Sequence, residues 1–199
     1  MIYRYLEGDP ALPVLLLLHG TGGGPDDLLP LARELSPGSA TLAPSGPVSE
    51  NGAKRWFRRL AEGVFDHSDV RARADQLAGF VLERQSEIAG RRLIAVGFSN
   101  GANIAAAVAL TRPDVLREAV LFSSMSPLPD PADADLAGTR VFLSNGEQDP
   151  MAPLPSTDRL VRQFRERHAE VRTHRWPGGR QITSEGVAAA RDWLARVGA

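Results

Sequence analysis

A serine between two glycines is the residue of this chain best suited to nucleophilic chemistry. It lies in the stretch Gly97-Phe98-Ser99-Asn100-Gly101, which an apolar run precedes and an alanine-rich run follows. This pattern predicts a strand, a sharp turn and a helix, with the serine hydroxyl presented at the carboxyl end of a sheet. The glycines suit a turn at which strand and helix approach too closely for a Cβ. The backbone N–H of Asn100 begins the helix and would point at a developing oxyanion.

Three further strand ends carry residues that suit the same chemistry. In chain order the four strand ends are His19-Gly20-Thr21-Gly22-Gly23, Ser99, Asp149 and Gly178-Gly179-Arg180. In open parallel sheets, sites form outside the carboxyl ends of the strands. Along the chain, these four strand ends would supply, in turn, a glycine loop that binds an oxyanion, a nucleophile, an acid and the position at which a base is expected. That is the order of an α/β-hydrolase.

Apolar runs and amphipathic segments alternate along the chain, which predicts one α/β domain over residues 1–199. We expect a mostly parallel sheet with helices on both faces. The expected strands are residues 2–6, 13–19, 40–43, 93–96, 118–123, 139–144 and 170–176. The expected helices are a segment that opens at 25–27, residues 70–88, the elbow helix to about 111, residues 156–168, and a last helix with Val187, Ala190, Leu194 and Val197 on one face. Residues 44–68 are expected to form one long loop.

Composition argues against several classes of function. The 199 residues carry a net charge of −1, which gives no general attraction to nucleic acid or to an anionic membrane. There is no cysteine, so disulfides, thiolate metal sites and a cysteine nucleophile are excluded. No signal peptide is visible, and the longest apolar run, residues 14–18, is too short to cross a bilayer. We expect a cytoplasmic protein without nucleic-acid or membrane partners, as a monomer or homodimer.

Taken together, these motifs resemble those of the phospholipase/carboxylesterase family of small α/β-hydrolases, close to its dienelactone-hydrolase-like branch. The resemblance covers nearly the whole chain and includes Gly146-Glu147-Gln148-Asp149-Pro150 and the loop at residues 58–66. It implies a single-domain α/β-hydrolase fold and a serine carboxylesterase that cleaves small or medium esters without a metal or other cofactor. It assigns Ser99 as the nucleophile and Asp149 as the acid. It also assigns the backbone N–H groups of Thr21 and Asn100 to the oxyanion hole.

Arg180 departs from the family pattern, in which this turn reads Gly-Gly-His and the histidine is the general base. A guanidinium has a pKa above about 12, so it offers no lone pair to the proton of Ser99 near neutral pH. We expect it to pair with Asp149 and to leave Ser99 protonated. This chain should then hydrolyse esters weakly or not at all. Arg180 is either natural or an introduced change; the other motifs are intact, which favours an introduced change.

The four histidines of the chain are the possible substitute bases. His19 belongs to the glycine loop, where a supporting role is favoured, and His168 is expected to be exposed near a helix end. His174 lies six residues before Arg180, well upstream of the strand end at about 3.3 Å per residue. His67, in the long loop, is the only plausible substitute. An active esterase that uses His67 is one alternative, and a non-catalytic ligand-binding protein on the same fold is another.

Residues 54–59, Lys-Arg-Trp-Phe-Arg-Arg, have two interpretations. In the first, Trp56 and Phe57 line a substrate pocket together with Gly22 and Met151, and an arginine meets a carboxylate of the substrate. In the second, the two aromatic side chains cap the core and the charged groups face water. The sequence leaves both open.

Overall fold

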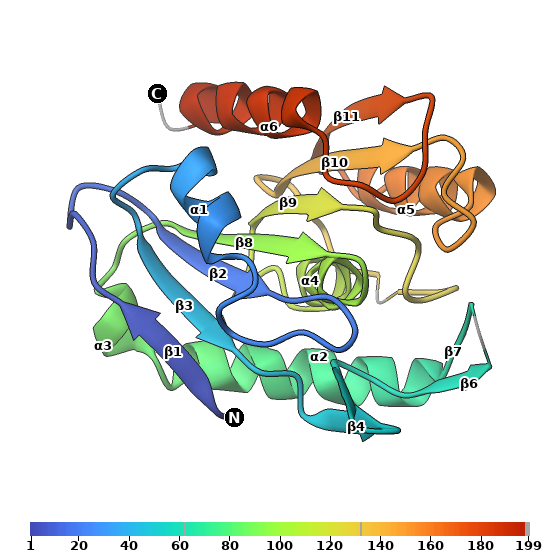
Figure 1. The fold of residues 1–199 in the computed structure, drawn as a ribbon, viewed down its shortest axis with the longest axis horizontal. Coiled ribbons are helices and arrows are strands. Elements are labelled where there is room, and N and C mark those ends of the chain that lie inside the picture. The colour runs from blue at the N-terminus through green and yellow to red at the C-terminus, as the bar shows by residue number, and fades with distance from the viewer. Residues whose placement is uncertain (62, 132, 198–199) are drawn as a thin grey trace.

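The computed structural model describes residues 1–61, 63–131 and 133–197 of the chain (Figure 1). Within these ranges the chain forms a seven-stranded sheet in the order β1-β3-β2-β8-β9-β10-β11. All neighbouring strands run parallel except β1 and β3. The strands of the sheet are β1 (Tyr3–Leu6), β2 (Val14–Leu18), β3 (Ala40–Pro44), β8 (Leu93–Phe98), β9 (Glu118–Phe122), β10 (Arg140–Gly146) and β11 (Glu170–Trp176). The predicted α/β fold with a mostly parallel sheet is confirmed.

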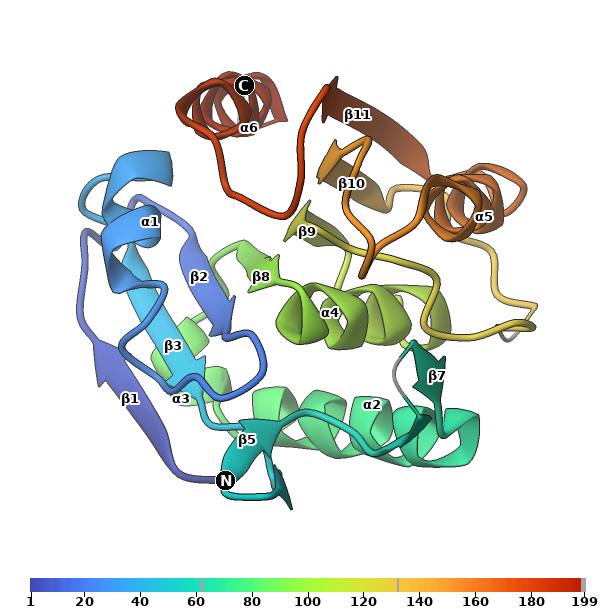
Figure 2. The same cartoon turned by 45° about the vertical axis from the view of Figure 1, so that its right-hand side comes forward.

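Helices cover both faces of this sheet, as predicted (Figure 2). They are α1 (Leu29–Leu35), α2 (His67–Leu82), α3 (Gln85–Ile88), α4 (Asn100–Thr111), α5 (Leu154–Arg165) and α6 (Ser184–Val197). One core cluster joins the sheet to α2, α4 and α5, and a second joins it to α1 and α6. Strand β2 contributes to both, because Leu16 and Leu18 belong to the first cluster and Leu15 and Leu17 to the second. A strand buried on both faces therefore reads as a continuous apolar run.

The segment at residues 44–68 is more regular than the sequence predicts. It contains two small hairpins, β4 (Val48–Glu50) with β5 (Ala53–Arg55) and β6 (Arg59–Ala61) with β7 (Val64–Phe65). The expectation of a single irregular loop is therefore wrong. Each of these strands has at most three residues, which is too short to show the alternation by which a strand is recognised.

The segment expected as one helix over residues 70–88 consists of two. Helix α2 begins three residues early because Asp66 caps it, accepting a hydrogen bond from the N–H of Asp69 at 3.1 Å. It ends where the N–H of Arg84 donates to the carbonyl of Val81, three residues back instead of four. Helix α3 then follows as a single turn.

An ion-pair bridge joins the amino ends of β8, β9 and β10. Glu118 is buried, and its two carboxylate oxygens lie 2.6 Å from Nη2 of Arg92 and 2.5 Å from Nη2 of Arg140. Ser99 follows the carboxyl end of β8, so the bridge lies at the opposite end of the parallel strands. It connects three neighbouring strands without taking part in the candidate site.

The last helix, α6, buries Val187, Ala190 and Leu194 against the sheet as predicted. The side chain of Val197, which we expected on the same face, lies outside the described residues. Within the described ranges, no helix combines the length and the apolar character that crossing a bilayer requires.

Candidate active site

Ser99 lies at the turn between β8 and α4. Its φ of 56° and ψ of −117° place a non-glycine residue in a rarely occupied region, as expected at the apex of a nucleophile elbow. The turn is held from both sides. The N–H of Ser99 donates to the carbonyl of Phe122 at 2.9 Å, and its own carbonyl accepts from the N–H of Asn103 at 2.9 Å. The predicted strand, turn and helix are therefore present.

The two glycines that flank the serine are required by close backbone contacts. A Cβ on Gly101 would lie 1.9 Å from the carbonyl oxygen of Leu18, and a Cβ on Gly97 would lie 2.6 Å from Cα of Ala102. Backbone atoms on both sides leave no room for a larger residue. The predicted close approach of strand and helix at this turn is confirmed.

The nitrogen that faces the Ser99 hydroxyl belongs to Arg180. Nη2 of its guanidinium donates a hydrogen bond to Oγ of Ser99. Two further contacts hold this arginine. Its backbone carbonyl accepts from Oγ of Ser123 at 3.3 Å, and its Cζ lies 5.9 Å from the centroid of the Phe98 ring. A guanidinium only donates hydrogen bonds, so this contact supplies no base.

The turn that carries Arg180 packs against the end of β10 through backbone contacts. A Cβ on Gly146 would lie 1.9 Å from the carbonyl oxygen of Gly179, so the two segments touch at this glycine. The N–H of Gln148 also donates to the carbonyl of Gly178 at 2.8 Å. The position of residue 180 beside Ser99 thus depends on the main chain rather than on its own side chain.

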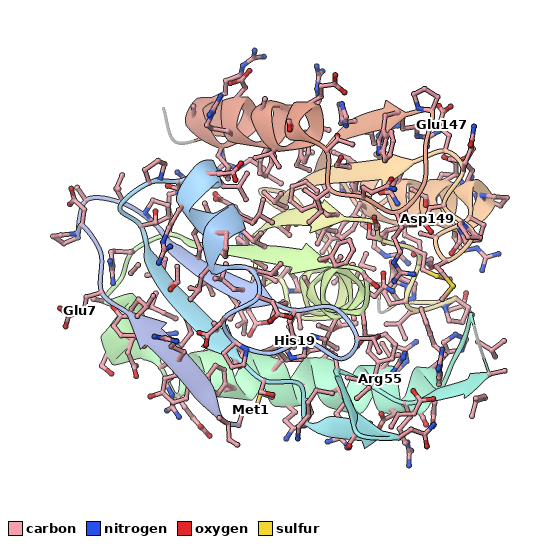
Figure 3. All side chains as sticks on the ribbon, viewed as in Figure 1. Met1, Glu7, His19, Arg55, Glu147 and Asp149 are labelled. Atoms are coloured by element: carbon pink, nitrogen blue, oxygen red, sulfur yellow. The ribbon has the colours of Figure 1, made fainter. Side chains whose placement is uncertain are left out.

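Asp149 follows β10 and is 3% exposed, whereas Glu147, two residues earlier, is exposed (Figure 3). Oδ1 of Asp149 accepts a hydrogen bond from the N–H of Met151 at 2.9 Å. The buried Oδ2 of Asp149 has no hydrogen-bonding partner among the described residues. The expected pairing with Arg180 is wrong, because the guanidinium is directed at Ser99 instead. A buried carboxylate oxygen normally has a donor. Oδ2 of Asp149 therefore lacks the donor that a buried carboxylate oxygen normally has.

Thr21 and Asn100 line the same cavity as Ser99. Asn100 is the first residue of α4, so its N–H has no acceptor within the helix. Its side-chain Oδ1 accepts from the N–H of Trp56 at 2.7 Å, and Oγ1 of Thr21 accepts from Nη1 of Arg55 at 3.3 Å. Side-chain contacts therefore fix both residues in the cavity wall.

The aromatic pair of the 54–59 cluster packs in the core. Trp56 and Phe57 are 1% and 0% exposed, and Nε1 of Trp56 donates to the carbonyl of His19 at 2.8 Å. Phe57 packs edge-on against Phe65 with 4.9 Å between ring centroids. Burying both rings removes more apolar surface from water than an open pocket wall would. The structure corrects the expected pocket lining accordingly: neither residue lines the cavity, and nor does Gly22.

The cavity at Ser99 has a volume of about 320 Å³. It brings together five of the predicted site residues, namely Thr21, Ser99, Asn100, Met151 and Arg180. Its wall also contains Phe65, Phe98 and Met125, which the sequence did not single out, and Arg55 and Arg59 of the cluster at 54–59. The basic cluster at 54–59 signalled an arginine at the site, but only the two hairpins show which arginines reach it.

None of the four histidines, all of them in the described ranges, lines this cavity. His19 is buried and uses both ring nitrogens. Its Nδ1 lies 2.7 Å from the carbonyl of Gly20, its Nε2 accepts from the N–H of Gly46 at 2.9 Å, and burial lowers its pKa. His174 contacts Oγ of Ser144 at 3.1 Å. His67 is exposed at the start of α2, and the exposed His168 contacts Asp135 at 3.0 Å.

The described residues offer no evident metal site either. Within them, His, Asp and Glu side chains do not form a group of three that could hold a metal ion. The groups that line the cavity include the hydroxyl of Ser99 and the guanidinium groups of Arg55, Arg59 and Arg180.

Comparison with known proteins matches the chain over nearly its whole length. The sequence profile of the family described as Phospholipase/Carboxylesterase matches residues 6–197. The protein MhqD of Bacillus subtilis (strain 168) is 41% identical over 182 residues, which cover 90% of this chain and 91% of MhqD. Among solved structures, the Bacillus cereus carboxylesterase has a TM-score of 0.94 and 38% identity, covering 98% of this chain and 93% of that one. The carboxylesterase from Mesorhizobium loti has a TM-score of 0.89 and 30% identity, with 97% and 93% covered.

Proposed function

Because the chain belongs to the phospholipase/carboxylesterase family, we propose that it carries the scaffold of a serine carboxylesterase for small or medium esters. Ser99 is the nucleophile, Asp149 is the acid, and the N–H groups of Thr21 and Asn100 form the oxyanion hole. The chain as it stands hydrolyses esters poorly, because Arg180 occupies the position of the base. The observation that carries this proposal is the hydrogen bond from the guanidinium to Oγ of Ser99.

The proposed reaction fails at proton transfer. Oγ of Ser99 attacks the ester carbonyl carbon, the carbonyl electron pair moves onto oxygen, and the serine proton must leave. Collapse of this intermediate expels the alcohol, which must gain a proton, and water then releases the acid by the same steps. Each half needs one group that accepts a proton and returns it. Arg180 is always protonated near neutral pH and cannot serve in either half.

The unpaired oxygen of Asp149 supports this assignment. In a serine triad the buried carboxylate accepts a hydrogen bond from the N–H of the base and orients it. Oδ2 of Asp149 is buried without a donor among the described residues, as expected for a triad acid whose partner has been replaced. The family resemblance supplies the identity of that partner, a histidine at position 180.

The test is Arg180→His, measured as turnover of p-nitrophenyl acetate. Loss of one triad member typically costs about 10⁴-fold or more, so the substitution should raise kcat by orders of magnitude. Arg180→Gln is the matched control, since it removes the guanidinium without supplying a base and should stay slow. Ser99→Ala in the Arg180→His background should abolish the gain. An unchanged rate in Arg180→His would reject the assignment of the base.

A second candidate is a non-catalytic ligand-binding protein on the same fold. It is favoured by one observation, that the Ser99 hydroxyl is occupied by a permanent donor. A fluorophosphonate probe separates the two candidates. It should label Ser99 in Arg180→His if the scaffold is that of an esterase, and it should leave the serine unmodified if the site only binds.

An esterase that uses His67 remains the third alternative. His67 is exposed at the start of α2 and does not line the cavity, so we expect His67→Ala to leave the residual activity nearly unchanged. Loss of that activity in His67→Ala would favour the alternative over our proposal.

A further inference from the structure

Three guanidinium groups line the cavity at Ser99. Arg55 ends β5, Arg59 begins β6, and Arg180 lies in the turn after β11, so three separate segments deliver them to one wall. No aspartate or glutamate is among the described residues that line the cavity. Arg58, by contrast, is 62% exposed and pairs with Asp66 at 3.1 Å outside the cavity. The fold thus places Arg55, Arg59 and Arg180 at the cavity, whereas Arg58 of the same basic cluster lies outside it.

One carboxylate serves two of these arginines. The two oxygens of Glu50 lie 3.2 Å from Nε of Arg55 and 2.9 Å from Nε of Arg59. Arg180 pairs with no carboxylate among the described residues, because its guanidinium faces Ser99 and not Asp149. Among the described residues, the three guanidinium groups of the wall therefore form ion pairs with one carboxylate, that of Glu50.

The environment of Arg55 shows that these charges affect one another. Its side chain is 5% exposed, and burial lowers its pKa. Glu50 acts in the opposite direction, while the positive charges of Arg59 and Arg180 lower the pKa further. An anion bound between the guanidinium groups would relieve this repulsion, and planar guanidinium groups match a carboxylate in geometry as well as in charge.

The rest of the wall suits an apolar chain. Phe65, Phe98, Met125 and Met151 line the cavity beside the arginines and Ser99. A volume of about 320 Å³ holds a small molecule with one apolar and one charged part. A ligand with a short methylene chain and a terminal carboxylate matches both kinds of lining.

We propose that this cavity selects esters whose acyl chain ends in a free carboxylate, which pairs with Arg59 and Arg180 while the chain lies against the apolar lining. That the ligand is an ester substrate rests on the proposed function; the recognition of its carboxylate does not. Arg55 is held by Glu50, Thr21 and the carbonyl of Phe57, so it contributes charge from a fixed position.

Binding of adipate tests the recognition without catalysis. Isothermal titration calorimetry at constant ionic strength should show saturable binding of adipate to the unmodified chain and none of 1,6-hexanediol, which has the same length without charge. Arg59→Gln should weaken adipate binding about tenfold or more, and Arg59→Lys, which keeps the charge but loses the planar fork, should bind with an affinity between those of Arg59→Gln and the unmodified chain. The control is Arg33→Gln, which removes an exposed arginine of α1 and should bind as the unmodified chain does. Equal affinity in Arg59→Gln, or binding of the diol as tight as that of adipate, would overturn the proposal.

In the Arg180→His background, from which the guanidinium of Arg180 is absent, hydrolysis tests selection of the substrate by Arg59. The ratio of kcat/KM for mono(4-nitrophenyl) adipate to that for 4-nitrophenyl methyl adipate should exceed one, and adding Arg59→Gln should lower it several-fold. A ratio that does not respond to Arg59→Gln contradicts selection by this residue. If adipate binds as expected but Arg180→His cleaves neither ester, the recognition stands and the esterase proposal fails. The two proposals can therefore fail separately.

Discussion

At the scale of single residues, the hydroxyl of Ser99 accepts a hydrogen bond from Arg180, whereas the proposed catalysis requires a group that accepts the proton of that hydroxyl. Ser99 has the backbone conformation of a nucleophile elbow, and Arg180 donates to its Oγ. Oδ2 of the buried Asp149 has no hydrogen-bonding partner among the described residues, and Asp149 follows Ser99 in the chain as the acid of an α/β-hydrolase triad does. Serine and aspartate were predictable because each follows an apolar run at a recognisable turn. The direction of the guanidinium was not, since the sequence favoured Asp149 as its partner.

The unpaired oxygen of Asp149 leads to a chemical rescue experiment. Arg180→Gly should leave space beside Ser99 that free imidazole can enter, with its N–H toward Asp149. We expect p-nitrophenyl acetate turnover by Arg180→Gly to rise saturably with imidazole, because the added ring accepts the serine proton.

Imidazole itself hydrolyses this ester, so the rescue is measured against Ser99→Ala/Arg180→Gly under the same conditions. Asp149→Ala/Arg180→Gly should lose most of the gain, since the ring is then no longer oriented. A linear response equal to that of the Ser99→Ala variant would show that imidazole acts only in solution.

At the scale of elements, close backbone contacts position the site. Strand β8 meets helix α4 at Gly97, strand β2 meets α4 at Gly101, and the end of β10 touches the turn after β11 at Gly146. The long strands and helices were predictable, because their apolar patterns extend over several residues. The hairpins β4–β5 and β6–β7 were not, and they carry Arg55 and Arg59. The part of the site that depends on short elements is therefore the part that the sequence alone did not locate.

Gly101→Ala tests the contact between β2 and α4. Its Cβ would overlap backbone atoms of Leu18, so we expect a loss of about 3 kcal/mol or more in the free energy of unfolding. Urea denaturation measures this change. Gly79→Ala in α2 is the matched control, since its Cβ would meet nothing within 4 Å, and it should stabilise the chain by up to about 1 kcal/mol. Similar stability for the two variants would contradict the contact.

At the scale of the whole molecule, the charged residues that join the strands lie at the opposite end of the sheet from the charged residues of the cavity. The bridge of Arg92, Glu118 and Arg140 lies at the amino ends of three strands, while the arginines of the cavity lie at the carboxyl ends. The alternation of strands and helices predicted the overall fold and the layers. It did not predict this bridge, because pairing charges across strands requires the strand order.

Glu118→Ala should destabilise the fold without involving the cavity. Removing the carboxylate leaves two partly buried guanidinium groups without their partner, which costs about 2–3 kcal/mol. The midpoint of urea denaturation at pH 7 measures the loss, with Glu34→Ala on the exposed face of α1 as the control. If both variants unfold at the same urea concentration, the bridge adds nothing to stability.

The contact between Gly146 and the Gly178–Gly179 turn has an evolutionary consequence. Main-chain atoms hold position 180 in place, so exchanging its side chain should cost the protein little of its fold. Selection can therefore change residue 180 to suit the ligand of the cavity without destabilising the fold. A lineage could pass between hydrolysis and simple capture of a ligand through one codon, and keep a well-folded protein throughout.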